Sequence, residues 1–356
     1  MVSAEKTEKP LRISQVMLSS GFGGGERLFV DLCLALANAG HMVQAVCHPE
    51  FEALSQLCHK GVEVSHLKVH WDWSPLAFNR LARLLREFRP AVIHSHLARG
   101  ATVAGHGGSI AGIPVVANLH NYVKLKYYRK ISHFLPGTQD QRKYLMAQGV
   151  RSDVITVVPH FSLIPIVSQT ESSTVEGPVF VTYGRFVRKK GFHVLVDSLR
   201  LLHDRGLPAR LVLGGDGPEK ASLQKQIYDS GLNEAVNLSG WVKDVPRFLS
   251  QSPFFILPSL DEPFGIVILE AMARKKVIIS TTTQGPREIL DDTTAYLQPP
   301  DDPAALADSM YRAYTDKEGS CQRAKSAWDR YKDQYSPEKV IPQFEVVYRD
   351  LAERFG

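Results

Sequence analysis

The sequence has little cysteine and no long apolar run. Its 356 residues include four cysteines, none of them in a CxxC pair, so a disulfide scaffold and a zinc ribbon are disfavoured and the cysteines are expected to be reduced core residues. No apolar stretch approaches the roughly 20 residues of a membrane-spanning helix, and residues 1–10 are polar. We expect a cytoplasmic protein that is neither exported by a signal peptide nor integral to a membrane.

The usual nucleotide-binding fingerprints are also missing. The glycine loop from Gly21 to Glu26 does not place its glycines in the GxGxxG spacing, and no Walker lysine follows it. A nicotinamide dehydrogenase and a P-loop enzyme are therefore disfavoured. A plain tight turn between a strand and a helix is an equal alternative for this loop.

The length and composition of the sequence indicate two domains that differ in net charge. The length suits two domains of roughly 150 residues, and a composition of 44% hydrophobic and 22% charged residues is that of a soluble globular protein. Residues 1–170 hold 18 basic and 11 acidic residues, whereas residues 171–356 hold 24 and 26. The basic excess of the first half leaves nucleic acid, an anionic membrane and a phosphorylated substrate as candidate partners.

Short apolar runs alternate with amphipathic stretches, which predicts βα units around parallel sheets. The predicted strands of the first half are 11–18, 43–47, 62–67, 91–94, 114–119 and 154–158, with a further βα unit at 133–149. Those of the second half are 179–183, 210–213, 235–238, 254–257 and 277–280. We predict a Rossmann-like domain at 1–160, a linker at 161–178, a second such domain at 179–335, and a capped helix at 336–356 that packs back on the first domain.

A cationic loop follows the first strand of the second half. Four basic residues lie between Gly184 and Gly191, where the carboxyl end of a strand meets a helix and where a diphosphate is readily neutralised. Arg185 and Lys190 are the favoured candidates. The alternative is a solvated charged loop.

Two glutamates follow the buried strand 254–257. Glu262 precedes Pro263, which suits a first helical turn, and Glu270 lies in an apolar run. Eight residues of helix rise would separate the two carboxylates by about 12 Å, too far for the paired carboxylates of a hydrolase. They suit two contacts along one extended ligand instead.

Together these motifs resemble retaining GT-B glycosyltransferases of family 4. The resemblance is carried, in order, by Gly23 to Arg27, Val92 to His96, Asn118 to His120, the loop from Gly184 to Gly191, Gly215 to Pro218 and the EPFG-x₄-E stretch from Glu262 to Glu270. It implies two Rossmann-like domains with parallel sheets that face each other across a cleft. It also implies transfer of a sugar from a nucleotide-diphosphate sugar, with retention and without a metal or other cofactor.

The resemblance assigns a role to each matching residue. Arg185 and Lys190 would bind the diphosphate, Glu262 the hexose hydroxyls, Glu270 the ribose hydroxyls, and the amides of Phe264 and Gly265 the sugar or phosphate. Gly24, Gly25 and Gly215 would approach the donor, and His120 would lie beside the reacting sugar. His160 stands where the family often has asparagine and glycine, which leaves its role open.

The first domain is expected to bind the acceptor, a glycan or a lipid-linked glycan. His96, Arg99, Tyr122 and Lys124 are the candidates on this side. For His94 and His96, which are spaced like a metal pair, a structural role is favoured over metal binding. The basic and aromatic stretch from Tyr122 to Lys130 is typical of segments that rest on an anionic membrane. Arg80 and Arg83, which share a helical face, add to the basic excess, and a solvated surface is an equal alternative for them.

The leading hypothesis is a glycosyltransferase of bacterial lipopolysaccharide or another surface polysaccharide, bound peripherally to the inner face of the cytoplasmic membrane. The first alternative is a GT-B relative that binds sugars or nucleotides without transferring them. The second is a basic nucleic-acid-binding protein, although nucleic acid is not the expected partner.

Overall fold

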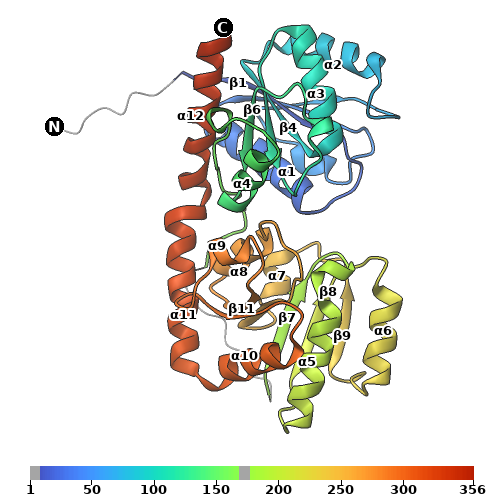
Figure 1. Cartoon of the computed structure of the whole chain (residues 1–356), viewed down its shortest axis with the longest axis vertical. Helices are drawn as coiled ribbons and strands as arrows, with labels where there is room; N and C mark the ends of the chain where they lie inside the picture. Colours follow the sequence, from blue (N-terminus) through green and yellow to red (C-terminus); the bar gives the residue numbers. More distant parts are fainter. Residues whose placement is uncertain (1–8, 168–176) are drawn as a thin grey trace, which may run out of the picture. The chain divides into compact units, whose positions relative to one another are not determined.

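The computed structural model describes residues 9–167 and 177–356, which form two compact units (Figure 1). Unit 1 comprises Met1–Phe161 and Pro337–Gly356, and unit 2 comprises Ser162–Ser336. Half of the predicted linker at 161–178, residues 168–176, lies outside the described residues, and the described residues 161–167 and 177–178 belong to no helix or strand.

Unit 1 is built on a six-stranded parallel sheet of order β3-β2-β1-β4-β5-β6. Its strands are β1 (Arg12–Met17), β2 (Met42–Cys47), β3 (Val62–His66), β4 (Val92–His96), β5 (Val115–Leu119) and β6 (His133–Pro136). Its helices are α1 (Gly24–Asn38), α2 (Pro75–Phe88), α3 (Leu97–Ala111), α4 (Gln139–Ala147) and α12 (Pro337–Phe355), with short 3₁₀ turns at Leu54–Leu57, Leu125–Tyr127 and Ser152–Val154. The order reverses between β1 and β4, the point at which open parallel sheets bind ligands.

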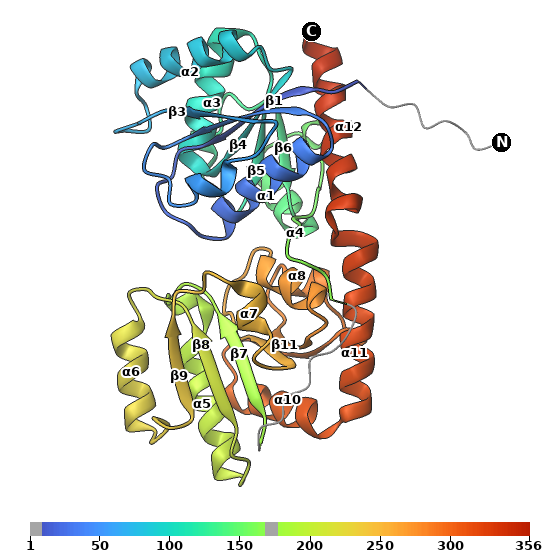
Figure 2. The ribbon, with the colours of Figure 1, turned by 180° about the vertical axis from the view of Figure 1, so that it is seen from behind.

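The alternation of side chains along β4 decides what each face of this sheet packs against. Ile93 points into the apolar cluster under α2 and α3, whereas the rings of His94 and His96 contact α12 and α1 on the other face. Figure 2 shows α1 and α12 on that second face, from opposite ends of the sequence. The C-terminal helix therefore covers His94, on the same face of the sheet as α1.

Unit 2 repeats the same topology. Its sheet has the order β12-β11-β10-β7-β8-β9, with β7 (Val179–Tyr183), β8 (Arg210–Gly214), β9 (Val236–Gly240), β10 (Phe254–Leu257), β11 (Val277–Thr281) and β12 (Ala295–Gln298). Its helices are α5 (Phe192–Asp204), α6 (Lys220–Asp229), α7 (Val245–Leu249), α8 (Ile266–Ala273), α9 (Pro286–Ile289), α10 (Pro303–Thr315) and α11 (Lys317–Arg330), with a 3₁₀ turn at Arg188–Lys190 and a π turn at Tyr331–Tyr335. The predicted fold class, α/β with two Rossmann-like domains, is confirmed.

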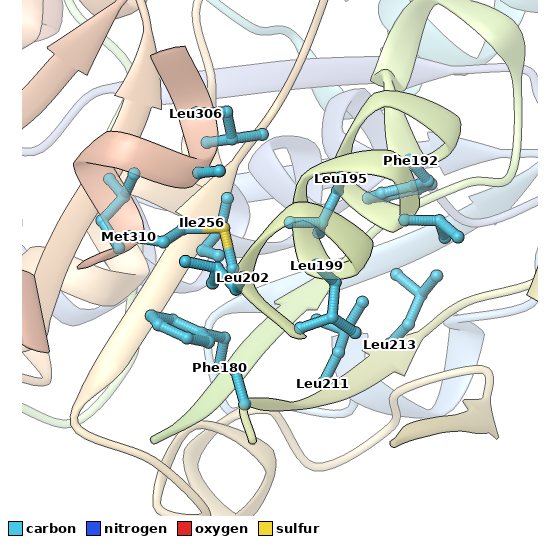
Figure 3. Close-up of a cluster of buried hydrophobic side chains, with 14 of the residues drawn as sticks. Phe180, Phe192, Leu195, Leu199, Leu202, Leu211, Leu213, Ile256, Leu306 and Met310 are labelled. Atoms are coloured by element: carbon cyan, nitrogen blue, oxygen red, sulfur yellow. The ribbon is translucent and has the colours of Figure 1, made fainter. Parts of the chain in front are cut away.

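The two faces of the second sheet carry separate apolar cores. Figure 3 shows one of them, in which Phe180 of β7, Leu199 of α5 and Met310 of α10 pack together. The other core contains Val181, which alternates with Phe180, and Leu269 of α8. Because both faces are covered, the strands read as continuous apolar runs, which is why the sequence predicts most of them correctly.

Several local predictions are wrong. Residues 154–158 form no strand in the described structure: only Ile155 makes a bridge, to Phe134, and the buried Val158 anchors an irregular segment. Strand β12 was not predicted, because four residues between turns carry too short a pattern. Cys58 and Cys321 are exposed, while Cys33 and Cys47 are the buried free thiols that were expected. Within the described residues, no helix is long and apolar enough to cross a membrane.

Candidate active site

A lysine and a glutamate form an ion pair at the carboxyl edge of the second sheet. Lys190 ends the loop after β7, and Glu262 lies in the loop after β10. The Nζ of Lys190 is 2.5 Å from Oε2 of Glu262, and the two side chains are 22% and 10% exposed. The hydroxyl of Ser259 donates to the same oxygen at 3.3 Å. Since β7 and β10 are paired parallel strands, two residues predicted from separate motifs meet.

The two loops that carry this pair are fitted together through backbone atoms. The amide of Leu260 donates to the carbonyl of Lys189 at 2.8 Å. Gly191 has φ +67°, and a Cβ there would lie 1.9 Å from the carbonyl oxygen of Pro258. Only glycine permits both this conformation and this approach, so Gly191 sets the position of Lys190 relative to Glu262.

A third loop, which sequence reasoning missed, holds the backbone of Glu262. The amide of Glu262 donates to Oε1 of Gln284 at 3.4 Å, and the amide of Gly285 donates to the carbonyl of Glu262 at 2.8 Å. A Cβ at Gly285 would lie 2.3 Å from Cα of Phe264. The available signal was a polar residue, a glycine and a proline in succession after the strand at 277–280, which is typical of a turn into a helix.

The glycine turn after β8 is packed onto the cationic loop. Gly215 has φ +143°, and a Cβ there would lie 2.0 Å from the carbonyl oxygen of Gly184. The amide of Gly215 donates to the carbonyl of Gly240 at 2.6 Å, so it is occupied within the fold. The side chain of Arg185, in the loop beneath this turn, is exposed at the edge of the sheet.

The second glutamate, Glu270, is buried, and it does not share one continuous helix with Glu262. Glu270 is 1% exposed and accepts a short hydrogen bond from the hydroxyl of Tyr183 at the end of β7. The expected spacing of about 12 Å by helix rise does not apply, because α8 begins at Ile266 and Pro263 lies before it. Gly265, with φ +97°, ends the preceding loop, and the Phe264 side chain is buried in the core.

In unit 1, the glycine loop is shorter than predicted because α1 begins at Gly24. The amide of Gly23 donates to Oε2 of Glu26 at 3.1 Å, the reach of a residue at the third helical position back to the N-cap. Gly24 and Gly25 therefore lie in the first turn, where amides lack partners within the helix. A Cβ at Gly25 would lie 3.2 Å from Cγ of His120, so the absence of a side chain lets the histidine ring approach the helix.

Four histidines lie ring against ring behind this helix end: two come from β4, and the others are His120 and His160. The ring centroids are 4.6 Å apart for His94 and His96, 5.3 Å for His96 and His120, and 5.5 Å for His120 and His160. Nδ1 of His96 is 3.0 Å from Nε2 of His120, and Nε2 of His96 is 2.9 Å from Oε1 of Gln15. Nδ1 of His94 is 2.6 Å from the hydroxyl of Tyr348 on α12.

These histidines are held neutral. Burial, followed by the nearby His120, lowers the pKa of His94 to about 3, and burial lowers the pKa of His120 to about 4. Burial also lowers the pKa values of His96 and His160 well below the usual range, because a charged imidazole loses its hydration there. At neutral pH each ring therefore carries one N–H donor and one unprotonated nitrogen that can accept a hydrogen bond.

This packing indicates structural roles for two of the histidines, His96 and His160. His96, expected on the acceptor side, is fully buried and uses both ring nitrogens within the protein, so it supports His120 instead of contacting a ligand. The sequence left the role of His160 open. Its ring is buried, and its Nε2 lies 3.1 Å from Nδ2 of Asn118. It fills the space behind His120.

Two of the other three candidates on this side, Arg99 and Tyr122, contact acidic side chains. Nε of Arg99 donates to Oδ1 of Asp72 at 2.8 Å, and the hydroxyl of Tyr122 donates to Asp140 in a short hydrogen bond. Lys124 is exposed. Across residues 9–167 and 177–356, no group of three histidine, cysteine, aspartate or glutamate side chains is arranged to hold a metal ion.

Two six-stranded Rossmann-like units, each with glycines and functional side chains at the carboxyl edge of its sheet, define the GT-B class of glycosyltransferases. Comparison with solved structures supports the fold: the structure of HepE from Anabaena in complex with UDP-glucose matches with a TM-score of 0.82 and 20% identity, over 96% of this chain and 100% of that one. The apo lipopolysaccharide outer core galactosyltransferase WaaB matches with a TM-score of 0.71 and 17% identity, over 97% and 99%.

Family models match both halves of the sequence. The model described as "Glycosyltransferase Family 4" matches residues 22–161, and "Glycosyl transferases group 1" matches residues 167–330. The lipopolysaccharide core biosynthesis glycosyltransferase LpsE of Rhizobium meliloti (strain 1021) is 28% identical over 76% of this chain and 79% of its own length. The chain belongs to the family 4 glycosyltransferases, as the sequence motifs predict.

Proposed function

We propose that the protein transfers a hexose from a nucleotide-diphosphate sugar to a glycan or lipid-linked acceptor in the synthesis of lipopolysaccharide or a related surface polysaccharide. The Lys190–Glu262 pair carries this proposal. It places a cation and a carboxylate at one sheet edge, where the cation neutralises a diphosphate and the carboxylate accepts hydrogen bonds from sugar hydroxyls. The names of LpsE and LpsD, both lipopolysaccharide core glycosyltransferases, support the acceptor class.

The donor is proposed to occupy unit 2. Arg185 and Lys190 would neutralise the diphosphate, Glu262 would hold the hexose, and the buried Glu270 would receive the ribose hydroxyls once the short contact with Tyr183 rearranges. The Phe264 and Gly265 amides, with the Gly215 turn, would approach the sugar and phosphates. UDP-sugars are the first donors to test, because HepE has been solved with UDP-glucose.

The acceptor is proposed to bind unit 1. His120 would lie beside the reacting sugar, with Gly24 and Gly25 toward the donor phosphates and Arg99, Tyr122 and Lys124 toward the acceptor. Transfer is proposed to proceed with retention, by attack on the same face of the sugar while a phosphate oxygen takes the acceptor proton. The cations supply the leaving-group stabilisation that a metal supplies elsewhere, so no metal or other cofactor is proposed.

The test compares two neighbouring ion pairs. Lys190→Met and Glu262→Gln should each lower kcat for release of nucleoside diphosphate by about 10²–10³, the usual effect of removing one group that stabilises developing charge. Lys189→Met is the matched control, because Lys189 pairs with Asp261 at 3.6 Å on the exposed side of the same loops. Wild-type turnover in both site variants would overturn the proposal.

Retention and metal independence need their own measurements. The anomeric proton coupling of the transferred sugar in the glycoside product should show the configuration of the donor. EDTA should leave the rate unchanged. An inverted product would refute retention, and a rate lost to EDTA and restored by Mg²⁺ would refute metal independence.

Unit 1 is proposed to contact the anionic inner face of the cytoplasmic membrane. It carries the basic excess of the chain, and Trp71 and Leu76, flanking the start of α2, are 66% and 70% exposed. Such residues suit the interface between headgroups and acyl chains. Co-sedimentation with vesicles rich in anionic phospholipid should exceed that with zwitterionic vesicles and fall with salt. Equal sedimentation with both vesicle types would refute the contact.

A further inference from the structure

Hydrogen bonds, together with the stacking of His94 on His96, link the C-terminal helix and β1 to His120 within unit 1. Tyr348 of α12 contacts His94 at 2.6 Å, and Gln15 of β1 contacts His96 at 2.9 Å. His96 in turn contacts His120 at 3.0 Å. The participants other than His120 are fully buried, so water does not exchange for these partners.

The amide of Gln15 fixes the direction of the hydrogen bonds. Its Oε1 is an acceptor only, so Nε2 of His96 carries the proton and donates to it. A neutral His96 then has a lone pair on Nδ1, which accepts from Nε2–H of His120. A neutral His120 protonated at Nε2 has its own lone pair on Nδ1.

Tyr348 holds the ring that packs against His96. Its hydroxyl lies 2.6 Å from Nδ1 of His94, and the rings of His94 and His96 are stacked with their centroids 4.6 Å apart. His94, His96 and Tyr348 are fully buried, so a tilt of His94 would displace His96 from Gln15 and His120. The C-terminal helix therefore helps to keep the two hydrogen bonds of His96 in place.

The lone pair of His120 faces the first turn of α1. A Cβ at Gly25 would lie 3.3 Å from Nδ1 of His120, so this edge of the ring rests against the helix N-terminus. Amides there carry partial positive charge, which favours an unprotonated nitrogen over an imidazolium. The helix end and the amide of Gln15 therefore select the same tautomer from opposite sides of the ring.

We propose that Gln15 and Tyr348 are positioning residues that hold His120 as the Nε2–H tautomer, with Nδ1 presented as a hydrogen-bond acceptor for a hydroxyl of the bound sugar or acceptor. The role in transfer rests on the function proposed above. The tautomer itself does not depend on it. Tyr348 thus gives the C-terminal helix a part in the site.

The first test measures the tautomer directly. Long-range ¹H–¹⁵N correlation spectra of the full-length protein with labelled histidine should show a pyrrole-like Nε2 and a pyridine-like Nδ1 for His120, assigned by loss of its signals in His120→Asn. Gln15→Met removes the acceptor while keeping the volume, and should shift the tautomer ratio about fivefold, the worth of one hydrogen bond. An Nδ1–H tautomer in the wild-type protein would overturn the proposal.

The second test separates positioning from mere packing. Tyr348→Phe keeps the ring and removes the hydroxyl, and Gln15→Glu restores an acceptor that Gln15→Met lacks. We expect Tyr348→Phe and Gln15→Met to lower kcat about fivefold without changing the KM for the donor, and Gln15→Glu to recover most of the loss. Tyr128→Phe, a buried tyrosine of the same unit, should retain wild-type kcat.

The two readouts keep this inference separate from the proposed function. A correct His120 tautomer without transfer to any glycan acceptor would count against the proposed function alone. Transfer with an unchanged kcat in both Gln15→Met and Tyr348→Phe would overturn the positioning role. If either variant fails to fold, the wild-type spectrum still decides the tautomer.

Discussion

The Lys190–Glu262 pair leads to a prediction about stability that needs no substrate. Lys190→Met leaves a carboxylate of 10% exposure without its cation, and Glu262→Gln leaves the lysine beside a neutral amide. The double variant removes both charges. If the two groups stabilise each other in the ligand-free protein, each single change should cost more than its share of the double change.

The structure sets the size of the effect. Breaking a fully buried pair by removing one partner costs about 3–5 kcal/mol, whereas exposed pairs contribute about 0–1 kcal/mol. Side chains that are 22% and 10% exposed lie between these limits, so we expect about 2 kcal/mol for Lys190→Met. The coupling energy of the cycle should be about 1–2 kcal/mol, because the double variant leaves no unpaired charge.

Urea denaturation of the four proteins, followed by tryptophan fluorescence, gives these free energies. The neighbouring pair Lys189–Asp261 is the control: its side chains are 41% and 39% exposed, so its coupling energy should stay below about 0.5 kcal/mol. Single variants at Lys190 and Glu262 that are each as stable as wild type, with additive effects, would refute the reasoning.

The remaining predictions concern two glycines and the histidines. Gly191→Ala places a Cβ 1.9 Å from the carbonyl oxygen of Pro258 at φ +67°. In urea it should lower the free energy of unfolding by well over the roughly 1 kcal/mol expected for the control Gly206→Ala, where φ is +81° and the space is open. Equal losses in the two variants would contradict the predicted clash. Gly25→Ala should displace the His120 ring, which would be 3.2 Å from the new Cβ, and lower kcat about tenfold; a wild-type kcat would contradict the close approach. Because the pKa values of His94 and His120 fall from 6.5 to about 3 and about 4 in the folded protein, the unfolded chain takes up protons first on acidification. Their stabilisation is complete above pH 6.5 and is lost as the pH falls toward those values, by up to about 1.4 kcal/mol per pH unit for each histidine. Equal urea midpoints at pH 7 and pH 5 would refute this.

Most strands could be predicted from the sequence, because both faces of each parallel sheet are covered and its strands are continuous apolar runs. The motifs also made Lys190 and Glu262 candidates, and the two side chains meet because each lies in the loop after such a strand and the carboxyl ends of neighbouring parallel strands share one edge. The segment 154–158 was wrongly predicted as a strand because it is also an apolar run. Its buried apolar residues anchor irregular backbone beside β6. The start of α8 was misplaced because Pro263 suits a first helical turn as well as the loop it occupies.

The sequence by itself determined the fold class, the family and the residue types that gather at each sheet edge, because strand periodicity and turn glycines are local properties of the chain. Only the tertiary structure decided which partners those residues meet. Gln284 and Gly285 clamp Glu262 from a loop more than twenty residues away, and Tyr348 reaches His94 across 254 positions. Contacts between such distant residues leave no periodic trace in a single sequence, because they depend on how the strands are ordered in the sheet and on which face each helix covers.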